Sequence, residues 1–224
     1  GHTIEEITLV KAGIIKPGAP VVTAARGEAL GVIESVCLDK KSPLYVVGRD
    51  LSWQPAAWNL SGQEFSLRGR RKYYEKLFIP LLGRHQLVNA ATAVAAAEVL
   101  MDLGVSLNGD VVRLGLARTR WPGRMEIVSQ KPLVIIDGAH NYDGARCLRQ
   151  ALEEYFPGRS IVMVIGMLGD KERALVAAEL AGVARAVVVT RPDNPRANNW
   201  RELAEEVRNY TSEVYLLEDT GEAV

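Results

Sequence analysis

The second half of the chain alternates short apolar runs with amphipathic stretches. Four runs rich in β-branched residues predict strands at Leu133–Ile136, Ile161–Ile165, Ala186–Val189 and Val214–Leu217. Between the runs, apolar residues recur at helical spacing. Two of these helix faces consist of Ala145, Leu148, Leu152 and Phe156, and of Trp200, Leu203, Val207 and Tyr210. Apolar strands that alternate with amphipathic helices favour an α/β fold with a mostly parallel sheet covered on both faces.

The polar residues of this half follow the expected strands directly. The four loops read "DGAHN", "GMLGDKE", "RPDNPRA" and "EDTGEA". Because ligands bind outside the carboxyl ends of strands in such sheets, we expect the chemistry of this half to gather along one edge. The first loop, after Ile136, combines a carboxylate, a histidine and an amide with two glycines. It is either a polar turn or a nucleotide site.

The first half has a less regular pattern. Its expected elements are a helix at Ile4–Ile15, a strand in "PVVTA", a helix at Glu28–Asp39, a strand in "LYVVG", hairpin-like segments between 50 and 82, an alanine-rich helix from Asn89 and a helix near Asp110–Ala117. The segment "RTRWPGRMEIV" carries Pro122-Gly123 and is interpreted as the hinge. The expected domains are residues 1–125 and 126–224.

Composition excludes several classes of protein. Lys plus Arg and Asp plus Glu both number 27, so no overall charge attracts nucleic acid or an anionic membrane. Cys37 and Cys147 have no metal-type spacing, and no apolar run is long enough for a membrane helix. We therefore expect a cytoplasmic protein. The chain starts with Gly1-His2 and stops just after the last expected strand, which favours a fragment of a longer protein.

Four motifs together resemble one enzyme family. "KAGIIKPGAPVVTA", "GRHQLVNAATAVAAAEVL", "WPGRMEIV" and "VIIDGAHNYDGA" occur in the order and at the spacing found in folylpolyglutamate and dihydrofolate synthases, members of the Mur ligase superfamily. The resemblance implies a partial P-loop ATPase-type domain followed by a Rossmann-like domain. It also implies an ATP- and Mg²⁺-dependent ligase that joins glutamate to folate or dihydropteroate through an acyl phosphate. The implied parent is a monomer with small-molecule substrates, binding neither nucleic acid nor membrane.

The resemblance gives Lys11 a catalytic role. In the superfamily the lysine at this point is often carbamylated, which turns a cation into an oxygen ligand for Mg²⁺. Its apolar neighbours favour burial, which would lower the pKa of the lysine and so help it react with carbon dioxide. The alternative is a lysine that interacts with the dipole at the end of a helix. Val10 departs from the glutamate that usually precedes this lysine.

ATP contacts are implied for four more residues. The amide of Asn89 can pair with a purine edge, although a helix N-cap is an equal alternative. Arg124 follows the hinge and can reach phosphate or ribose with its planar guanidinium. Asp137 can accept both ribose hydroxyls, and His140 can stack on the nucleotide or form a hydrogen bond with it. The implied ATP-binding set is therefore Asn89, Arg124, Asp137 and His140.

Other residues of the same loops have open roles. Asn141 or Asp143 is expected to cap the following helix, and Tyr142 stands where the family usually has proline. Asp170, Lys171 and Arg196 are either substrate contacts or solvated charges. The metal-binding histidine that the family carries upstream of Lys11 has no counterpart, since His2 lies too close.

The sequence also lacks a feature that the superfamily uses. It holds no GxxxxGK[ST] phosphate loop, so the fragment alone is expected to be inactive. The alternatives are a peptidoglycan-precursor ligase of the Mur type and a non-catalytic nucleotide-binding module.

Overall fold

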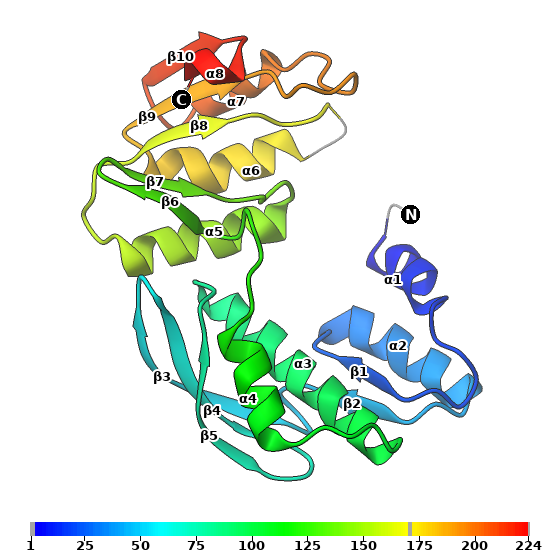
Figure 1. Ribbon diagram of the computed structural model, residues 1–224. Helices are drawn as coiled ribbons and strands as arrows, with labels where there is room; N and C mark the ends of the chain where they lie inside the picture. Colours follow the sequence, from blue (N-terminus) through cyan, green and yellow to red (C-terminus); the bar gives the residue numbers. More distant parts are fainter. Residues whose placement is uncertain (1–2, 170–171, 224) are drawn as a thin grey trace. The chain divides into compact units, whose positions relative to one another are not determined.

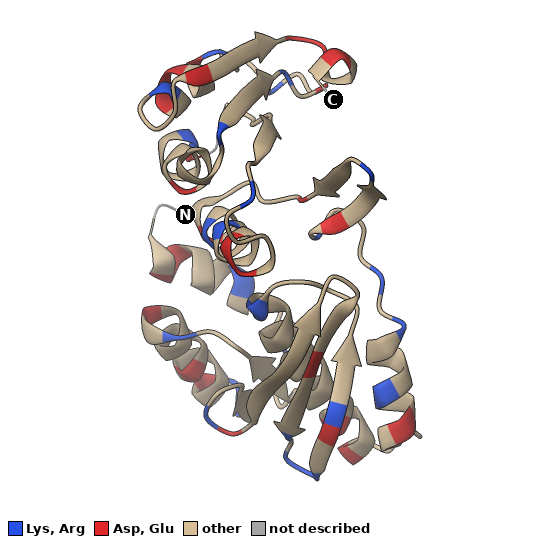
Figure 2. Cartoon of the chain, turned by 90° about the vertical axis from the view of Figure 1, so that its left-hand side faces the viewer, with Lys and Arg blue, Asp and Glu red and all other residues tan. Residues whose placement is uncertain are grey.

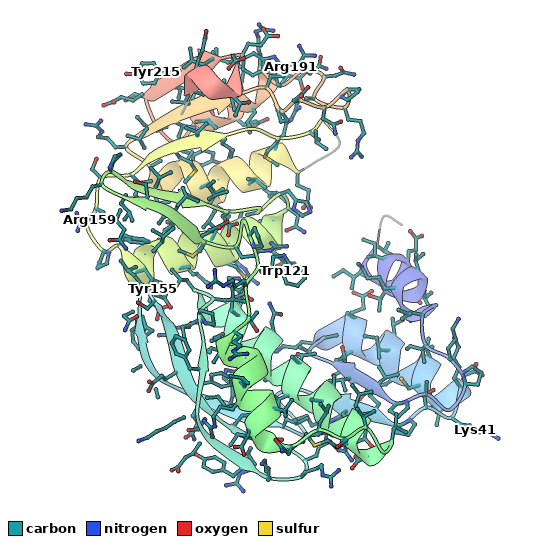
Figure 3. The ribbon with its side chains drawn as sticks, in the orientation of Figure 1. Lys41, Trp121, Tyr155, Arg159, Arg191 and Tyr215 are labelled. Carbon is teal, nitrogen blue, oxygen red and sulfur yellow. The ribbon has the colours of Figure 1, made fainter. Side chains whose placement is uncertain are left out.

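The computed structural model describes residues 3–169 and 172–223, and the contacts between residues divide the chain into two compact units between Arg120 and Trp121 (Figure 1). The exposed side chain of Trp121 opens the second unit (Figure 3). The boundary expected between residues 125 and 126 lies a few residues later than this division, where the first strand of the second unit begins. The segment that was interpreted as a hinge therefore includes the start of a hairpin.

A βαβ unit begins the first unit. Helix α1 (Ile4–Ala12) is followed by β1 (Val21–Thr23), α2 (Gly27–Asp39) and β2 (Leu44–Val46), and the two strands pair in parallel. Buried Ala12, Ile15 and Cys37 form a small core there. Helix α1 ends three residues earlier than expected, because the N–H of Gly13 already caps the carbonyls of the last turn.

An antiparallel meander and two helices complete the first unit. The meander consists of β3 (Ser52–Asn59), β4 (Gly62–Arg68) and β5 (Tyr73–Ile79), in the order β3-β4-β5. Alternate residues of β4 and β5, such as Phe65 and Leu77, are fully buried in the same core as Ala91 and Val94 of α3 (Arg84–Asp102). Helix α4 (Gly109–Ala117) starts at Asn108, whose side chain accepts from the N–H groups of the first turn.

A buried glutamate holds the turn between β4 and β5 on α3. Glu98 is 0% exposed, and its carboxylate accepts hydrogen bonds from the backbone N–H of Arg70 at 2.7 Å and of Arg71 at 3.3 Å. One helical turn later, Asp102 binds both guanidinium groups at 2.8 and 3.0 Å. Burial, followed by the charge of Glu98, raises the pKa of Tyr74 to about 12. This cluster fixes the end of the meander to the alanine-rich helix.

The second unit starts with a hairpin and continues with alternating helices and strands. Its elements are β6 (Glu126–Gln130), β7 (Leu133–Ile136), α5 (Tyr142–Tyr155), β8 (Val162–Ile165), α6 (Arg173–Leu180), a 3-10 turn (Ala181–Val183), β9 (Ala186–Thr190), α7 (Glu202–Arg208), β10 (Glu213–Leu217) and α8 (Thr220–Ala223). Strands β8, β9 and β10 form a parallel sheet in the order β10-β9-β8. Helices α6 and α7 and strand β9 supply most of its core, including Val176, Val189 and Leu203.

One strand expectation is wrong. Leu133–Ile136 was expected to belong to the parallel sheet, but it pairs antiparallel with β6, from Gln130 opposite Leu133 to Glu126 opposite Ile136. The reason is the short turn at 131–132, which returns the chain directly onto β6. The parallel sheet of the second unit, as far as its residues are described, therefore has three strands, not four.

Charged residues are distributed over both units. Figure 2 shows acidic and basic residues interspersed along the elements of both units. Within the described residues, no helix combines the length and the apolar character needed to span a bilayer.

Candidate nucleotide site

The turn after β7 is built around the carboxylate of Asp137. Its Oδ1 accepts from the N–H of Ala139 at 2.8 Å, and its Oδ2 accepts from the N–H of Met125 at 2.9 Å. The side chain is half-buried. Each oxygen keeps a second lone pair for a ligand hydroxyl, so the expected ribose contact would have to share these oxygens with the backbone.

Arg124 lies on a segment that is fixed to this turn. The carbonyl of Gly123 accepts from the N–H of Gly138 at 2.8 Å, and the N–H of Gly123 donates to Glu126 at 2.8 Å. The residue after Arg124 is bonded to Asp137, so both neighbours of the arginine are tied down. The Arg124 side chain is exposed. The structure thus brings Arg124, Asp137 and the following turn together, as the sequence suggested.

His140 belongs to the same turn and has a defined ring orientation. Its Nδ1 lies 2.8 Å from the carbonyl oxygen of Gly138. A carbonyl only accepts, so this contact requires the proton on Nδ1, and Nε2 of the neutral ring is left as an acceptor. The ring is exposed. His140 can therefore accept a hydrogen bond from a ligand hydroxyl through Nε2.

Helix α5 begins directly after this histidine. Asn141 is its N-cap and accepts from the N–H of Gly144 at 2.9 Å, which decides between the two caps expected from the sequence. Asp143 pairs instead with Arg146 at 3.3 Å on the exposed side of the first turn. The start of a fourteen-residue helix carries partial positive charge, and the N–H of Tyr142 there donates to the carboxylate of Glu172 at 3.3 Å. An anionic ligand beside His140 would share this end of the helix with Glu172.

A buried arginine joins the loops that follow β8 and β9, and sequence reasoning missed it. Arg173 is 8% exposed and donates to the carbonyls of Asn199 at 2.8 Å and Asn198 at 3.0 Å, with Glu202 at 3.3 Å. The N–H of Gly169 also donates to the carbonyl of Arg196 at 2.9 Å. The side chain of Arg196 is exposed, and the predicted sites Asp170 and Lys171 lie outside the described residues.

Glu218, in the loop after β10, forms ion pairs with arginines of the same unit. Glu218 pairs with Arg191 at 2.9 Å and with Arg201 at 3.0 Å, and the hydrogen bond from Arg191 lowers the pKa of its carboxyl group. Arg191, which is labelled in Figure 3, directly follows β9. This pair of arginines therefore neutralises the acid at this end of the sheet.

Asn89 lies in the first unit and does not cap its helix. The cap of α3 is Gly83, and Asn89 stands in the second turn, where its Nδ2 donates to Gln86 Oε1 at 3.0 Å. Nε2 of Gln86 lies 3.0 Å from Nε2 of His85. The capping alternative is therefore wrong, because the helix starts five residues earlier than the alanine pattern indicated. The side-chain oxygen of Asn89 can still accept from a ligand.

Lys11 stands in the last turn of α1, and the expectation that it is buried is wrong. Its side chain is exposed, and its neighbours Leu9 and Val10 are 49% and 78% exposed. Helix α1 turns only Thr8 and Ala12 inward, so the apolar neighbours do not cover the lysine. The position also suits the alternative of a lysine at the end of a helix.

The described residues do not complete a site for Mg²⁺. They contain no group of three or more His, Cys, Asp or Glu side chains placed to hold a metal ion. Lys11 has no oxygen ligand unless it is carbamylated. By contrast, the exposed guanidinium of Arg124, the His140 ring and the start of α5 suit the anionic and polar groups of a nucleotide.

The linker that carries Arg124 and the turn that carries Asp137 and His140 fall within the region covered by one family model. The model of the Mur ligase glutamate ligase domain matches residues 123–224. Residues 123–224 belong to the Mur ligase family. This glutamate ligase domain contains all but the first two residues of the second unit.

Similarity to known enzymes also extends over the first unit. A dihydrofolate synthase/folylpolyglutamate synthase from Bacillus subtilis is 35% identical over 213 residues, which cover 93% of the chain and 50% of the relative. A structure of Mycobacterium tuberculosis folylpolyglutamate synthase complexed with ADP and AMPPCP has a TM-score of 0.90 at 32% identity, covering 100% of the chain and 52% of that chain.

A relative from the peptidoglycan branch aligns over less of the chain. A UDP-N-acetylmuramoyl-L-alanyl-D-glutamate–L-lysine ligase from Streptococcus sanguinis is 33% identical over 168 residues, or 72% of the chain and 34% of the relative. The chain spans about half the length of the folate-type relatives that it matches. The resemblance read from the four motifs is confirmed.

Proposed function

We propose that the chain is the C-terminal half of an ATP-dependent ligase that joins L-glutamate to folate, to dihydropteroate or to both. The observation that carries the proposal is the bonding that holds the linker of Arg124 to the turn of Asp137 and His140, just before the start of α5. The names of the relatives, and the nucleotides bound in the M. tuberculosis structure, support the same activity. ATP would supply the phosphoryl group that activates the carboxylate for attack by the glutamate amine.

The residues of the chain would bind and orient the nucleotide. Arg124 can form charge-assisted hydrogen bonds with phosphate or ribose, and the start of α5 adds positive potential for an anion. His140 can accept from a ribose hydroxyl through Nε2, and Asp137 can share its oxygens with a second hydroxyl. Asn89 would meet the adenine with its amide. Such positioning, together with neutralisation of charge, is the main task of a protein in phosphoryl transfer.

Mg²⁺ and the remaining properties of the enzyme belong to the same proposal. A carbamate on Lys11 could supply one oxygen ligand, and the other ligands would have to come from the nucleotide, water and the N-terminal half. The partners are small molecules, the enzyme is a monomer, and nucleic acid and membranes are not involved. Both cysteines are free, which suits a cytoplasmic location.

The two alternative functions differ from this proposal in testable ways. The peptidoglycan-type relative aligns over less of the chain than the folate-type relative, which favours folate as the acceptor. A non-catalytic nucleotide-binding module would respond to ATP but not to folate. Thermal unfolding of the whole enzyme with ATP, with folate and with both therefore separates a folate ligase from the two alternatives. A folate ligase should be stabilised by folate, because a ligand that binds the native state raises the melting temperature.

Arg124→Ala in the whole enzyme is expected to raise the KM for ATP by about 10- to 100-fold, the loss typical of a charge-assisted hydrogen bond. The KM for glutamate should change less than about twofold, because glutamate does not use this contact. Arg159→Ala is the matched control, since Arg159 is an exposed arginine of the same unit (Figure 3) and should change neither constant. Equal effects on both substrates, or none on ATP, would contradict the nucleotide role.

Lys11→Ala is expected to reduce turnover of the whole enzyme to background, because it removes the amine that would form the carbamate. Short carboxylic acids should restore part of the activity by occupying the vacated position, whereas bicarbonate should not. Lys16→Ala, which removes another exposed lysine a few residues further on, is the control and should retain activity. Near-normal turnover of Lys11→Ala would show that Lys11 is only a charge at the end of α1.

A further inference from the structure

The linker residues on both sides of Arg124 are bonded to the turn that follows β7. The last residue pair of the β6–β7 hairpin is Glu126 with Ile136. Beyond it, the N–H of Met125 donates to Asp137 Oδ2 at 2.9 Å, and the N–H of Gly138 donates to the carbonyl of Gly123 at 2.8 Å. Just beyond the last strand pair, the acceptor of the Met125 N–H is thus a side-chain carboxylate and not a backbone carbonyl.

Met125 needs such a restraint. Its φ of 46° lies in the left-handed region, which a side chain with a Cβ rarely adopts. Its side chain is only 2% exposed, so the residue is anchored in the interior of the unit. A strained backbone of this kind persists only where its surroundings fix it. The bond to Asp137 and the buried side chain together fix the backbone just after Arg124.

The carboxylate of Asp137 is already engaged on both oxygens. Oδ1 accepts from Ala139 at 2.8 Å within its own turn, while Oδ2 reaches across to the linker. One side chain therefore connects the turn that carries His140 to the linker that carries Arg124. A carboxylate that already accepts from two backbone N–H groups has less capacity for further donors than a free one.

We propose that Asp137 is a positioning residue for nucleotide binding, and that it acts through Arg124. Its carboxylate holds the linker so that the guanidinium of Arg124 and the ring of His140 face the same ligand. This inference rests on the proposed nucleotide role of Arg124. It goes beyond a ribose contact of Asp137 alone, because in that case Asp137 and Arg124 would contribute independently.

The test is a double-mutant cycle on the whole enzyme. The dissociation constant of AMPPCP is measured by calorimetry for the wild type, Arg124→Ala, Asp137→Asn and the double variant. Arg124→Ala should weaken binding about 10- to 100-fold and Asp137→Asn about 10-fold. The double variant should bind within about twofold of Arg124→Ala, because two residues that act through one contact are not additive.

The matched control is Glu153→Gln, which removes an exposed carboxylate in the last turn of α5, near Arg149. It should leave AMPPCP binding unchanged. Losses that multiply in the double variant would overturn the positioning role and favour a direct contact. No loss in Arg124→Ala would overturn the proposed nucleotide role of the arginine, and a loss confined to Asp137→Asn would then identify Asp137 as a direct ligand.

A second measurement needs no nucleotide. In the 224-residue chain, the amide proton of Met125 should exchange slowly with solvent, because it is bonded to Asp137. Asp137→Ala, which removes the acceptor, should speed this exchange. A Met125 amide that exchanges as fast as one in an unfolded peptide would overturn the clamp, whatever the binding data show.

Discussion

Replacing Glu98 with alanine is expected to destabilise the first unit by about 3 kcal/mol or more, the cost of removing the partner of buried polar groups. The carboxylate is fully buried and accepts the backbone N–H groups of Arg70 and Arg71. Without it, both donors lose their acceptor and the turn between β4 and β5 loses its attachment to α3. Urea unfolding monitored by tryptophan fluorescence measures the change, with Trp53 and Trp58 as probes in the meander.

Two further variants separate the buried contact from its exposed neighbour. Asp102→Ala removes the ion pairs with Arg70 and Arg71, which lie at the surface, and should cost no more than about 1 kcal/mol. Gly69→Ala should be destabilising, because its added carbon would come within 2.5 Å of the Glu98 carboxylate. All three of the nearest atoms belong to Glu98, so the cost of Gly69→Ala should largely disappear once Glu98 is alanine.

Two results would contradict the predicted role of Glu98. Additive costs of Glu98→Ala and Gly69→Ala would show that the two residues do not share a contact. A cost for Glu98→Ala no larger than that for Asp102→Ala would show that water replaces the buried carboxylate.

Helices and strands with a strong local pattern could be predicted from the sequence. The parallel strands and their helices were predicted correctly because buried strands are continuously apolar, whereas the apolar residues of an amphipathic helix recur every three to four positions. The start of α3 was missed, because "RHQLV" carries no cap signal and its helical state depends on packing. Strand β6 was missed because the Pro122-Gly123 turn beside it dominated the local pattern.

The sequence predicted only part of the candidate site, because contacts between residues far apart in the chain leave no local pattern. The grouping of Asp137 and His140 is local, so the sequence shows it directly. The contact of Asp137 with Met125 joins residues twelve positions apart, and no periodic pattern reveals it. Glu98 and Arg173 were missed because a charged residue normally lies at the surface, and only the folded chain shows that these two are buried.

The 224-residue chain alone is expected to show no ligase turnover, with a rate below about one-thousandth of that of the whole enzyme, because proximity and charge stabilisation supply most of the rate. It holds Asn89, Arg124, Asp137 and His140, but its sequence has no phosphate loop and its described residues form no cluster for a metal ion. The second unit has its own buried core and should stay folded, so loss of activity would not reflect unfolding.

The assay measures release of phosphate from ATP in the presence of folate and glutamate, for the chain and for the whole enzyme at equal concentration. Circular dichroism of the same samples shows that the chain is folded. AMPPCP should still bind the chain, but weakly, because the side chains around Arg124 remain while the backbone cradle for the phosphates is absent. Turnover of the chain within tenfold of the whole enzyme would contradict the prediction. It would mean that residues within this chain cradle the phosphates, in which case the positive start of α5 beside His140 would be the first place to substitute.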